Sequence, residues 1–157
     1  MKKVKFHFVF ISLAYLFTLL GCDSSKVAPS FDTQLLAIPN GWKISAATIS
    51  PALNGVTDYY SKILPDCGKD NLMFFKKDGS YKTDEGSTKC DPSDSQSIEG
   101  TWSFITAKNL LAFTPTNPDD FALALTIVSL TSTSFVYTSQ LDLLGQNYTI
   151  KVTLVPN

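Results

Sequence analysis

The chain has 157 residues, with 13 lysines, 14 acidic residues, no arginine and a formal charge of −1. This near balance provides no basic surface of the kind that binds nucleic acid, so we expect no nucleic-acid partner. The only histidine is His7, near the start, and the rest of the chain lacks the imidazole that Ser-His, Cys-His and zinc-hydrolase sites use. Carboxylates are plentiful, but no pattern brings two of them to one cleft, and we expect no enzyme.

Residues 1–21 have the order of a secretory signal peptide. Three lysines among the first five residues precede an apolar run from Phe6 to Leu20 and the small residue Gly21. The run has 15 residues, short of the roughly 20 that cross a bilayer as a helix. We therefore expect removal of residues 1–21 rather than a transmembrane anchor, which leaves 10 lysines against 14 acidic residues.

The segment Leu19-Leu20-Gly21-Cys22 resembles the lipobox of bacterial lipoproteins. In that family the cysteine after the cleavage site carries a thioether-linked diacylglycerol, and its new amino group is usually acylated. The resemblance implies that Cys22 is lipidated and that the membrane is a partner, because several acyl chains give stable anchoring. We expect a cell-envelope location, with the outer membrane preferred and the periplasmic or surface face left open.

Residues 22–40 contain serine, proline and scattered charge, and we expect a lipidated N-terminus followed by a flexible tether. From Gly41 onward, short runs rich in β-branched and aromatic residues alternate with turn residues, which predicts one all-β domain over residues 41–157. Eight strands are predicted, at about 42–50, 71–76, 80–84, 100–105, 110–114, 122–130, 135–141 and 147–154.

Two local patterns define how these strands are arranged. Asp78-Gly79 lies between two apolar runs and predicts a β-hairpin, in which we place Phe75 opposite Tyr81. Apolar and polar residues alternate in several strands, as in Trp102 and Phe104, which favours a closed antiparallel sheet or a sandwich. The stretch 51–70 is predicted as a long, lid-like loop, in which Thr57 could cap a short helix.

Beyond Cys22 the chain has two further cysteines, Cys67 and Cys90. In an oxidising compartment a disulfide is the expected state, and a free reactive thiol is the alternative. The hairpin register brings the two cysteines near each other if the strands stay close that far, although Gly86 and Pro92 suggest that the hairpin frays first.

The chain also resembles the lipocalin-like lipoproteins of Bacteroidota over about residues 41–154. The segments that carry the resemblance are Gly41-Trp42, Asp58-Tyr59-Tyr60, Cys67 with Asp70-Asn71, Asp78 to Tyr81, Cys90 to Asp94 and Gly100 to Phe104. The resemblance implies an eight-stranded, antiparallel, up-and-down barrel on a lipid-anchored protein, without naming a ligand. Lipocalins proper have one residue between the glycine and tryptophan and usually an arginine against that tryptophan, and this chain has neither feature.

Eight aromatic side chains are predicted to face inward and are candidates for lining a ligand cavity: Trp42, Phe75, Tyr81, Trp102, Phe104, Phe113, Tyr137 and Tyr148. An ordinary packed core is the alternative. Because arginine and mature-chain histidine are absent, we expect any ligand to be apolar and uncharged. We expect no cofactor and no metal, since the acidic loop residues do not match a calcium loop and fit a solvated surface. The alternative function is a non-catalytic envelope module that docks to another protein.

Overall fold

The structure is a computed structural model, and it describes residues 31–157. The predicted signal peptide, the lipidation site Cys22 and the first part of the tether lie outside the described residues. Within them, no helix is both long and apolar enough to cross a membrane. The elements are η1 (Thr33–Leu36), β1 (Trp42–Leu53), β2 (Val56–Asp58), α1 (Tyr59–Lys62), η2 (Asp66–Gly68), β3 (Leu72–Phe75), β4 (Ser80–Asp84), β5 (Ser97–Ile105), η3 (Thr106–Lys108), β6 (Leu110–Pro115), β7 (Leu123–Leu130), β8 (Phe135–Leu143) and β9 (Gln146–Pro156).

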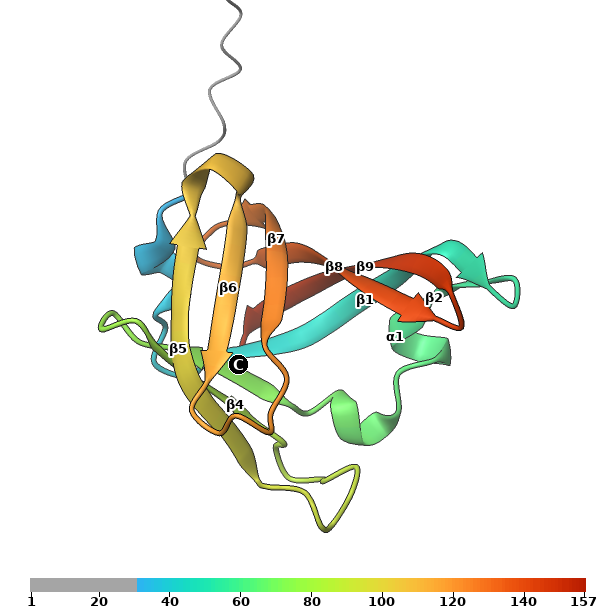
Figure 1. Ribbon diagram of the computed structural model, residues 1–157, viewed down its shortest axis with the longest axis horizontal. Coiled ribbons are helices and arrows are strands. Elements are labelled where there is room, and N and C mark those ends of the chain that lie inside the picture. The colour runs from blue at the N-terminus through green and yellow to red at the C-terminus, as the bar shows by residue number, and fades with distance from the viewer. Residues whose placement is uncertain (1–30) are drawn as a thin grey trace, which may run out of the picture.

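The strands form a closed antiparallel barrel (Figure 1). From β3 to β9 each strand pairs with the next along the chain, and β1 pairs with both β9 and β3, which closes a ring of eight. The remaining strand, β2, folds back on the far half of β1 as a ninth strand outside the ring. The all-β, eight-stranded barrel predicted from the sequence is therefore confirmed, and each predicted strand appears within a few residues of its expected bounds.

The inward-facing side chains form one core, and two irregularities keep them inward. The pairing of β1 with β9 shifts between Ile44 and Ala46, which places Ser45 in a bulge. The pairing of β7 with β8 shifts in the same way at Val128. After each shift the alternation resumes in the other phase, so that Ala47 and Ile49 face inward on the far part of β1.

The hairpin at Asp78-Gly79 has the predicted register, with Phe75 opposite Tyr81. Gly79 adopts φ +85°, a conformation that suits glycine, and the Asp78 carboxylate accepts hydrogen bonds from the Ser80 backbone and hydroxyl at 2.8 and 2.7 Å. In the next strand, Gly100 lies opposite Tyr81, and a Cβ on Gly100 would lie 2.1 Å from the Thr114 carbonyl oxygen. Glycine at this position therefore allows β4, β5 and β6 to approach closely.

One end of the barrel, which we call the closed end, is covered by the segment that precedes β1. The side chain of Leu36 in η1 is fully buried, and its carbonyl accepts a hydrogen bond from the indole Nε1 of Trp42 at 2.8 Å. Phe31 packs edge-on against Phe104 from β5 at a centroid distance of 6.3 Å. Within the segment predicted as tether, Leu36 therefore belongs to the core, and Phe31 and Ile38 are partly buried against it.

The opposite end, the open end, carries the connections β4–β5 and β6–β7, the β8–β9 turn, and the segment from β2 to η2. The ends of β1, β8 and β9 extend past the ring together with β2 and α1, on the right of Figure 1. The prediction of a long loop over 51–70 was wrong in part, since β1 continues to Leu53 and β2, α1 and η2 follow. The helix cap is Asp58 rather than Thr57, because the Asp58 carboxylate accepts from the Ser61 amide at 3.0 Å.

Candidate ligand-binding site

A cavity of about 180 Å³ lies inside the barrel between its aromatic core and the open end. Inward side chains of β1, β3, β4, β8 and β9 form its walls, and Gly68 and Asn71 bound it toward the open end. Its lining residues are Trp42, Ile44, Gly68, Asn71, Leu72, Met73, Thr83, Tyr137 and Leu154. None of them is charged, and most are apolar, which is the usual lining of a small-molecule site.

The centre of the barrel, in contrast, is filled by aromatic rings. Phe75 contacts Trp102, Phe113 and Phe135 at centroid distances of 5.9, 5.8 and 6.2 Å, and Tyr81 meets Phe113 at 4.9 Å. Such edge-to-face contacts are characteristic of a packed core. A ligand inside the barrel would therefore occupy the cavity near the open end rather than its centre.

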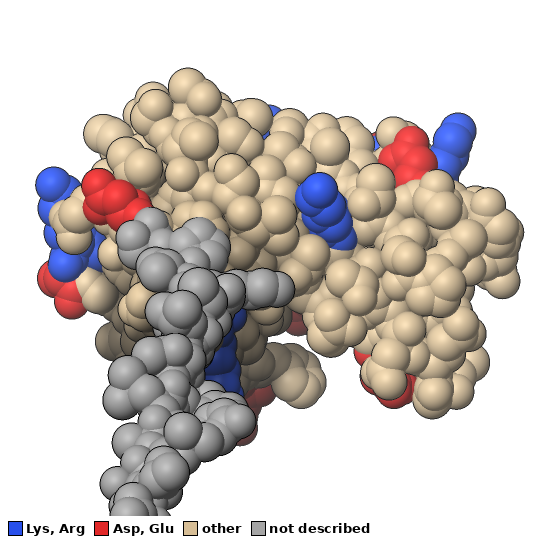
Figure 2. All heavy atoms as spheres, turned by 90° about the horizontal axis from the view of Figure 1, so that it is seen from above, with Lys and Arg blue, Asp and Glu red and all other residues tan. Residues whose placement is uncertain are grey.

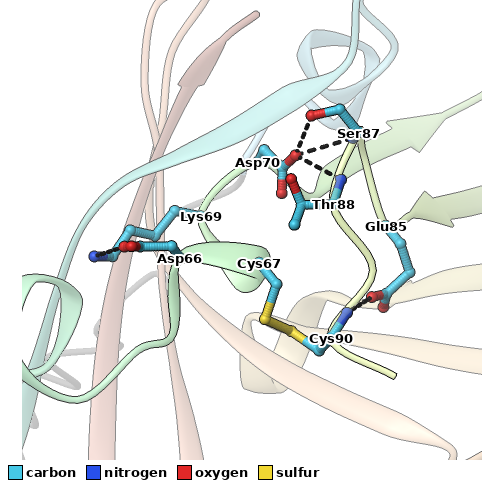
Figure 3. The surroundings of a disulfide bond; sticks show 8 residues. All are labelled: Asp66, Cys67, Lys69, Asp70, Glu85, Ser87, Thr88 and Cys90. Atoms are coloured by element: carbon cyan, nitrogen blue, oxygen red, sulfur yellow. Dashed lines mark hydrogen bonds and ion pairs between the residues drawn. A yellow bond between two sulfur atoms is a disulfide. The ribbon is translucent and has the colours of Figure 1, made fainter. Parts of the chain in front are cut away.

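Gly68 and Asn71, which border the cavity toward the open end, belong to residues 59–71, which we call the cover segment. Cys67 in this segment forms the predicted disulfide with Cys90 of the β4–β5 connection (Figure 3). Next to the disulfide, one carboxylate oxygen of Asp70 accepts three hydrogen bonds, from the Ser87 amide at 2.9 Å, the Ser87 hydroxyl at 2.6 Å and the Thr88 amide at 3.0 Å. The Ser87 hydroxyl is the main reason why the pKa of Asp70 is lowered.

Asn71 adds a further link between the cover segment and the β4–β5 connection. When the amide nitrogen of Asn71 is oriented toward the carbonyls of Cys67 and Glu85, it donates a hydrogen bond to each, at 2.9 and 3.0 Å. Together with the disulfide and Asp70, this bond holds η2 against the β4–β5 connection. The cover over the cavity is thus fixed by covalent and hydrogen-bonded contacts on one side.

The tyrosines of α1 help to hold the other side of the cover segment. Tyr59, Tyr60 and Ile63 are partly buried against the core. Lys69 lies 5.4 Å from the ring centroid of Tyr60 and pairs with Asp66 at 2.7 Å. These contacts pack the tyrosines of the Asp58-Tyr59-Tyr60 segment against the barrel.

Tyr137 differs from the other polar groups of the cavity wall. Its ring packs beside Phe135 at 5.4 Å, and within the described residues its hydroxyl makes no hydrogen bond. The hydroxyl of Tyr137 is protonated at neutral pH, as in any tyrosine, and burial raises its pKa further, to about 12. The cavity therefore offers an apolar wall with one neutral group that can donate a hydrogen bond.

The eight aromatic residues predicted to line a cavity are divided by the structure into three sets. Trp42 and Tyr137 line the cavity near the open end. Trp102 and Phe104 are only half buried, and neither lines this cavity. The remaining four, Phe75, Tyr81, Phe113 and Tyr148, are buried in the core.

Sequence reasoning did not propose Ile44, Met73 or Thr83 as lining residues. Leu154 carried a usable signal, because it belongs to the alternating apolar face of the last strand. Met73 alternates in the same way with Phe75, but its place in the cavity depends on its pairing with Trp42 across the ring closure. That long-range contact has no local signature in the sequence.

Two further hollows are present, one on the outer face of the barrel and one at the open end, where Asn71 and Thr83 line both the hollow and the cavity. One, of about 760 Å³, runs along the outer face of β3, β4 and β5 beside residues 37–39, and its rim carries Lys76, Lys77, Lys82 and Glu99. The other, of about 390 Å³, has polar walls at the open end and includes Asp84, Glu85, Asp94 and Asp120. Among the described residues, no three His, Cys, Asp or Glu side chains are grouped closely enough to hold a metal ion.

Charged residues are sparse on the face shown in Figure 2, where lysines and acids lie mainly near the margins. Two ion pairs are present among the described residues, between Lys69 and Asp66 and between Lys82 and Asp84, each at 2.7 Å. The hydrogen bond to Lys82 is also the main reason why the pKa of Asp84 is lowered. This face has no continuous basic patch of the kind that binds a nucleic acid.

The closed antiparallel barrel, with side chains filling its centre and a small cavity near one end, defines a lipocalin-like protein. The sequence profile of the Lipocalin-like domain family matches residues 41–137, more than half of the chain, and the chain belongs to this family. It is also similar to the 1.00 Å crystal structure of a DUF4847 family protein from Bacteroides vulgatus ATCC 8482, with 13% identity, 80% of this chain and 96% of that chain covered, and a TM-score of 0.48. No functionally curated protein matches the chain.

Proposed function

We propose that this protein is a lipid-anchored, non-catalytic protein of the cell envelope whose barrel binds a small, uncharged, apolar molecule beneath the cover segment. The observation that carries the proposal is the 180 Å³ cavity, whose lining has no charged side chain. An apolar cavity of about 150 Å³ is large enough to bind benzene, so this volume suits a ligand of about one six-membered ring. A buried carboxylate or phosphate would lack a cationic partner there.

Anchoring is proposed from the sequence of residues 1–22, with Cys22 as the lipidated residue and the outer membrane as the expected location. The first described residue, Phe31, packs at the closed end against Phe104. A lipid at Cys22 would therefore be attached through the closed end, and the open end would be free to face the aqueous space. Labelling of cells with a radioactive fatty acid should mark the wild-type protein and should not mark Cys22→Ala; equal labelling of both would refute anchoring.

Ligand binding is tested with the mature chain, residues 22–157, produced without lipid as Cys22→Ala. Titration with 1,4-xylene should shift the amide NMR signals of β1, β3 and β8 around the cavity. Met73→Trp fills the cavity and should abolish these shifts. Leu130→Trp is the matched control, because Leu130 is also partly buried against the core but does not line the cavity. Binding of 1,4-xylene that persists in Met73→Trp, or the absence of binding to the folded wild-type protein, would refute the proposed ligand binding.

A second candidate function, docking to another envelope protein, is favoured by one turn at the open end. Leu144 in the β8–β9 turn is fully exposed and adopts φ +55°, a left-handed conformation that costs about 1 kcal/mol for a residue other than glycine or asparagine. A large apolar side chain in this conformation has no benefit for the isolated fold. A photocrosslinking amino acid at position 144 should give a specific product in intact cells, while the same group at the exposed turn residue Asn54 should not.

A further inference from the structure

Three polar side chains of the cavity lining form contacts with other protein atoms. The Trp42 indole nitrogen donates to the Leu36 carbonyl at 2.8 Å, and the Asn71 amide bridges two carbonyls of the open end. The Thr83 hydroxyl lies 3.5 Å from the Ile98 carbonyl. Among the described residues, the hydroxyl of Tyr137 has no such partner, and it is therefore the polar group of the lining that a bound molecule can use.

Tyr137 is held rigidly enough to select ligands by this hydroxyl. It lies on β8 between paired strands, opposite Ile127 of β7 and Val152 of β9, both of which are buried. Its ring also contacts the fully buried Phe135. Because backbone pairing and core packing fix the ring on both sides, a ligand oxygen placed within reach of the hydroxyl does not have to order a mobile side chain.

We propose that Tyr137 makes the site selective for molecules of about one ring that carry a single neutral oxygen, such as a phenol, an alcohol or a ketone, over hydrocarbons of the same shape. This inference rests on the proposed binding function and adds the chemical class of ligand. An apolar molecule that fills the cavity displaces water from the tyrosine hydroxyl and leaves it without a partner, whereas an oxygen-bearing one satisfies it. The phenol carries the proton needed for donation at neutral pH, because the pKa of a tyrosine lies well above 7.

The same surroundings select against an anionic ligand. No lysine lines the cavity, and the nearby Lys69 and Lys82 each pair with a carboxylate, Asp66 and Asp84. A single neutral hydroxyl does not compensate the desolvation of a carboxylate or phosphate. The proposed ligand class is therefore polar at one atom and uncharged.

The test compares 4-methylphenol with 1,4-xylene, which differ by a hydroxyl in place of a methyl group. Both are titrated by amide NMR into the full mature chain with Cys22→Ala, and into the same chain carrying Tyr137→Phe. One hydrogen bond predicts that the wild-type site binds 4-methylphenol about three- to tenfold more tightly than 1,4-xylene. Tyr137→Phe should remove this preference, because 4-methylphenol loses its hydrogen bond and 1,4-xylene no longer leaves a hydroxyl without a partner. Tyr148→Phe is the matched control, because the Tyr148 hydroxyl bonds to Gln146 and lies outside the cavity lining.

The outcomes separate this inference from the proposed function. If both probes bind equally to the wild type, or if the preference persists in Tyr137→Phe, the selectivity assigned to Tyr137 is refuted while apolar ligand binding stands. If neither probe binds the folded wild-type protein, both the proposed binding function and the selectivity assigned to Tyr137 are refuted. If Tyr148→Phe removes the preference as fully as Tyr137→Phe does, the effect comes from general loosening of the barrel, and the assignment to Tyr137 is refuted.

Discussion

Removal of the disulfide between Cys67 and Cys90 should lower the free energy of unfolding by an amount that depends on the length of the loop that the disulfide closes. The two cysteines are 23 positions apart, and a loop of this length corresponds to about 3 kcal/mol in the chain-entropy description of the unfolded state. With a urea dependence of about 2 kcal/mol per molar, the unfolding midpoint of the double variant Cys67→Ala/Cys90→Ala should fall by about 1.5 M. The slope of the transition should rise, because the unfolded chain without the cross-link exposes more surface.

The assay is urea unfolding followed by tryptophan fluorescence, on the mature chain with Cys22→Ala so that no third thiol can exchange. Wild-type protein in excess dithiothreitol is the control, and it should unfold at the same midpoint as the double variant. A midpoint shift below about 0.3 M would refute the reasoning. It would show that the unfolded chain without the disulfide keeps residual structure between these segments, so that the cross-link removes little further entropy.

Three further predictions concern the barrel interior. Gly100→Ala should lower the unfolding free energy by about 3 kcal/mol, because its Cβ would meet the Thr114 carbonyl oxygen at 2.1 Å, while Thr101→Ala on the exposed face should have little effect in the same denaturation assay. Trp42→Phe should destabilise by about 2 kcal/mol, since it leaves the buried Leu36 carbonyl without its donor; an unchanged unfolding midpoint would contradict this. Because burial raises the pKa of Tyr137 to about 12 in the folded barrel, its contribution to the unfolding free energy is complete below pH 10 and is lost as the pH rises toward 12. Tyr137→Phe should therefore reduce the fall in unfolding free energy between pH 10 and pH 12. Equal pH profiles for the wild type and the variant would contradict this prediction.

The sequence was informative wherever a local pattern determines structure. Alternating residues marked the strands because side chains of a strand point in turn to opposite faces. Asp78-Gly79 located the hairpin and its register, because Gly79 takes a positive φ and Asp78 bonds to Ser80. The pairing of Cys67 with Cys90 followed from that register together with the expected oxidising compartment.

The features that the sequence did not reveal depend on contacts between distant segments. The bulge at Ser45 shifts the inward phase of β1, and its reason is the pairing of β1 with β9 more than 100 residues later. The sequence of residues 31–40 is typical of a tether, because its few apolar side chains show no helical or strand periodicity. In the folded barrel, however, the Leu36 carbonyl accepts a hydrogen bond from the indole of Trp42. For the cavity, Trp42 and Tyr137 could be proposed from their aromatic, inward-facing pattern, but which aromatics fill the centre and which line a space depends on packing between strands.

The two ends of the barrel are built differently, and this difference explains why a binding site would lie near one of them. At the closed end, the side chains of Leu36 and Trp42 are fully buried, and the indole of Trp42 donates a hydrogen bond to the Leu36 carbonyl. At the open end, β1 and β3 pair at only two positions, Trp42 with Met73 and Lys43 with Leu72, before β1 continues toward β2. The wall that would otherwise be made by a longer strand pair is replaced there by the cover segment. A disulfide and a few hydrogen bonds hold this segment at its margin, and a small cavity remains beneath it because a strand pair packs its side chains more tightly than a linked loop does.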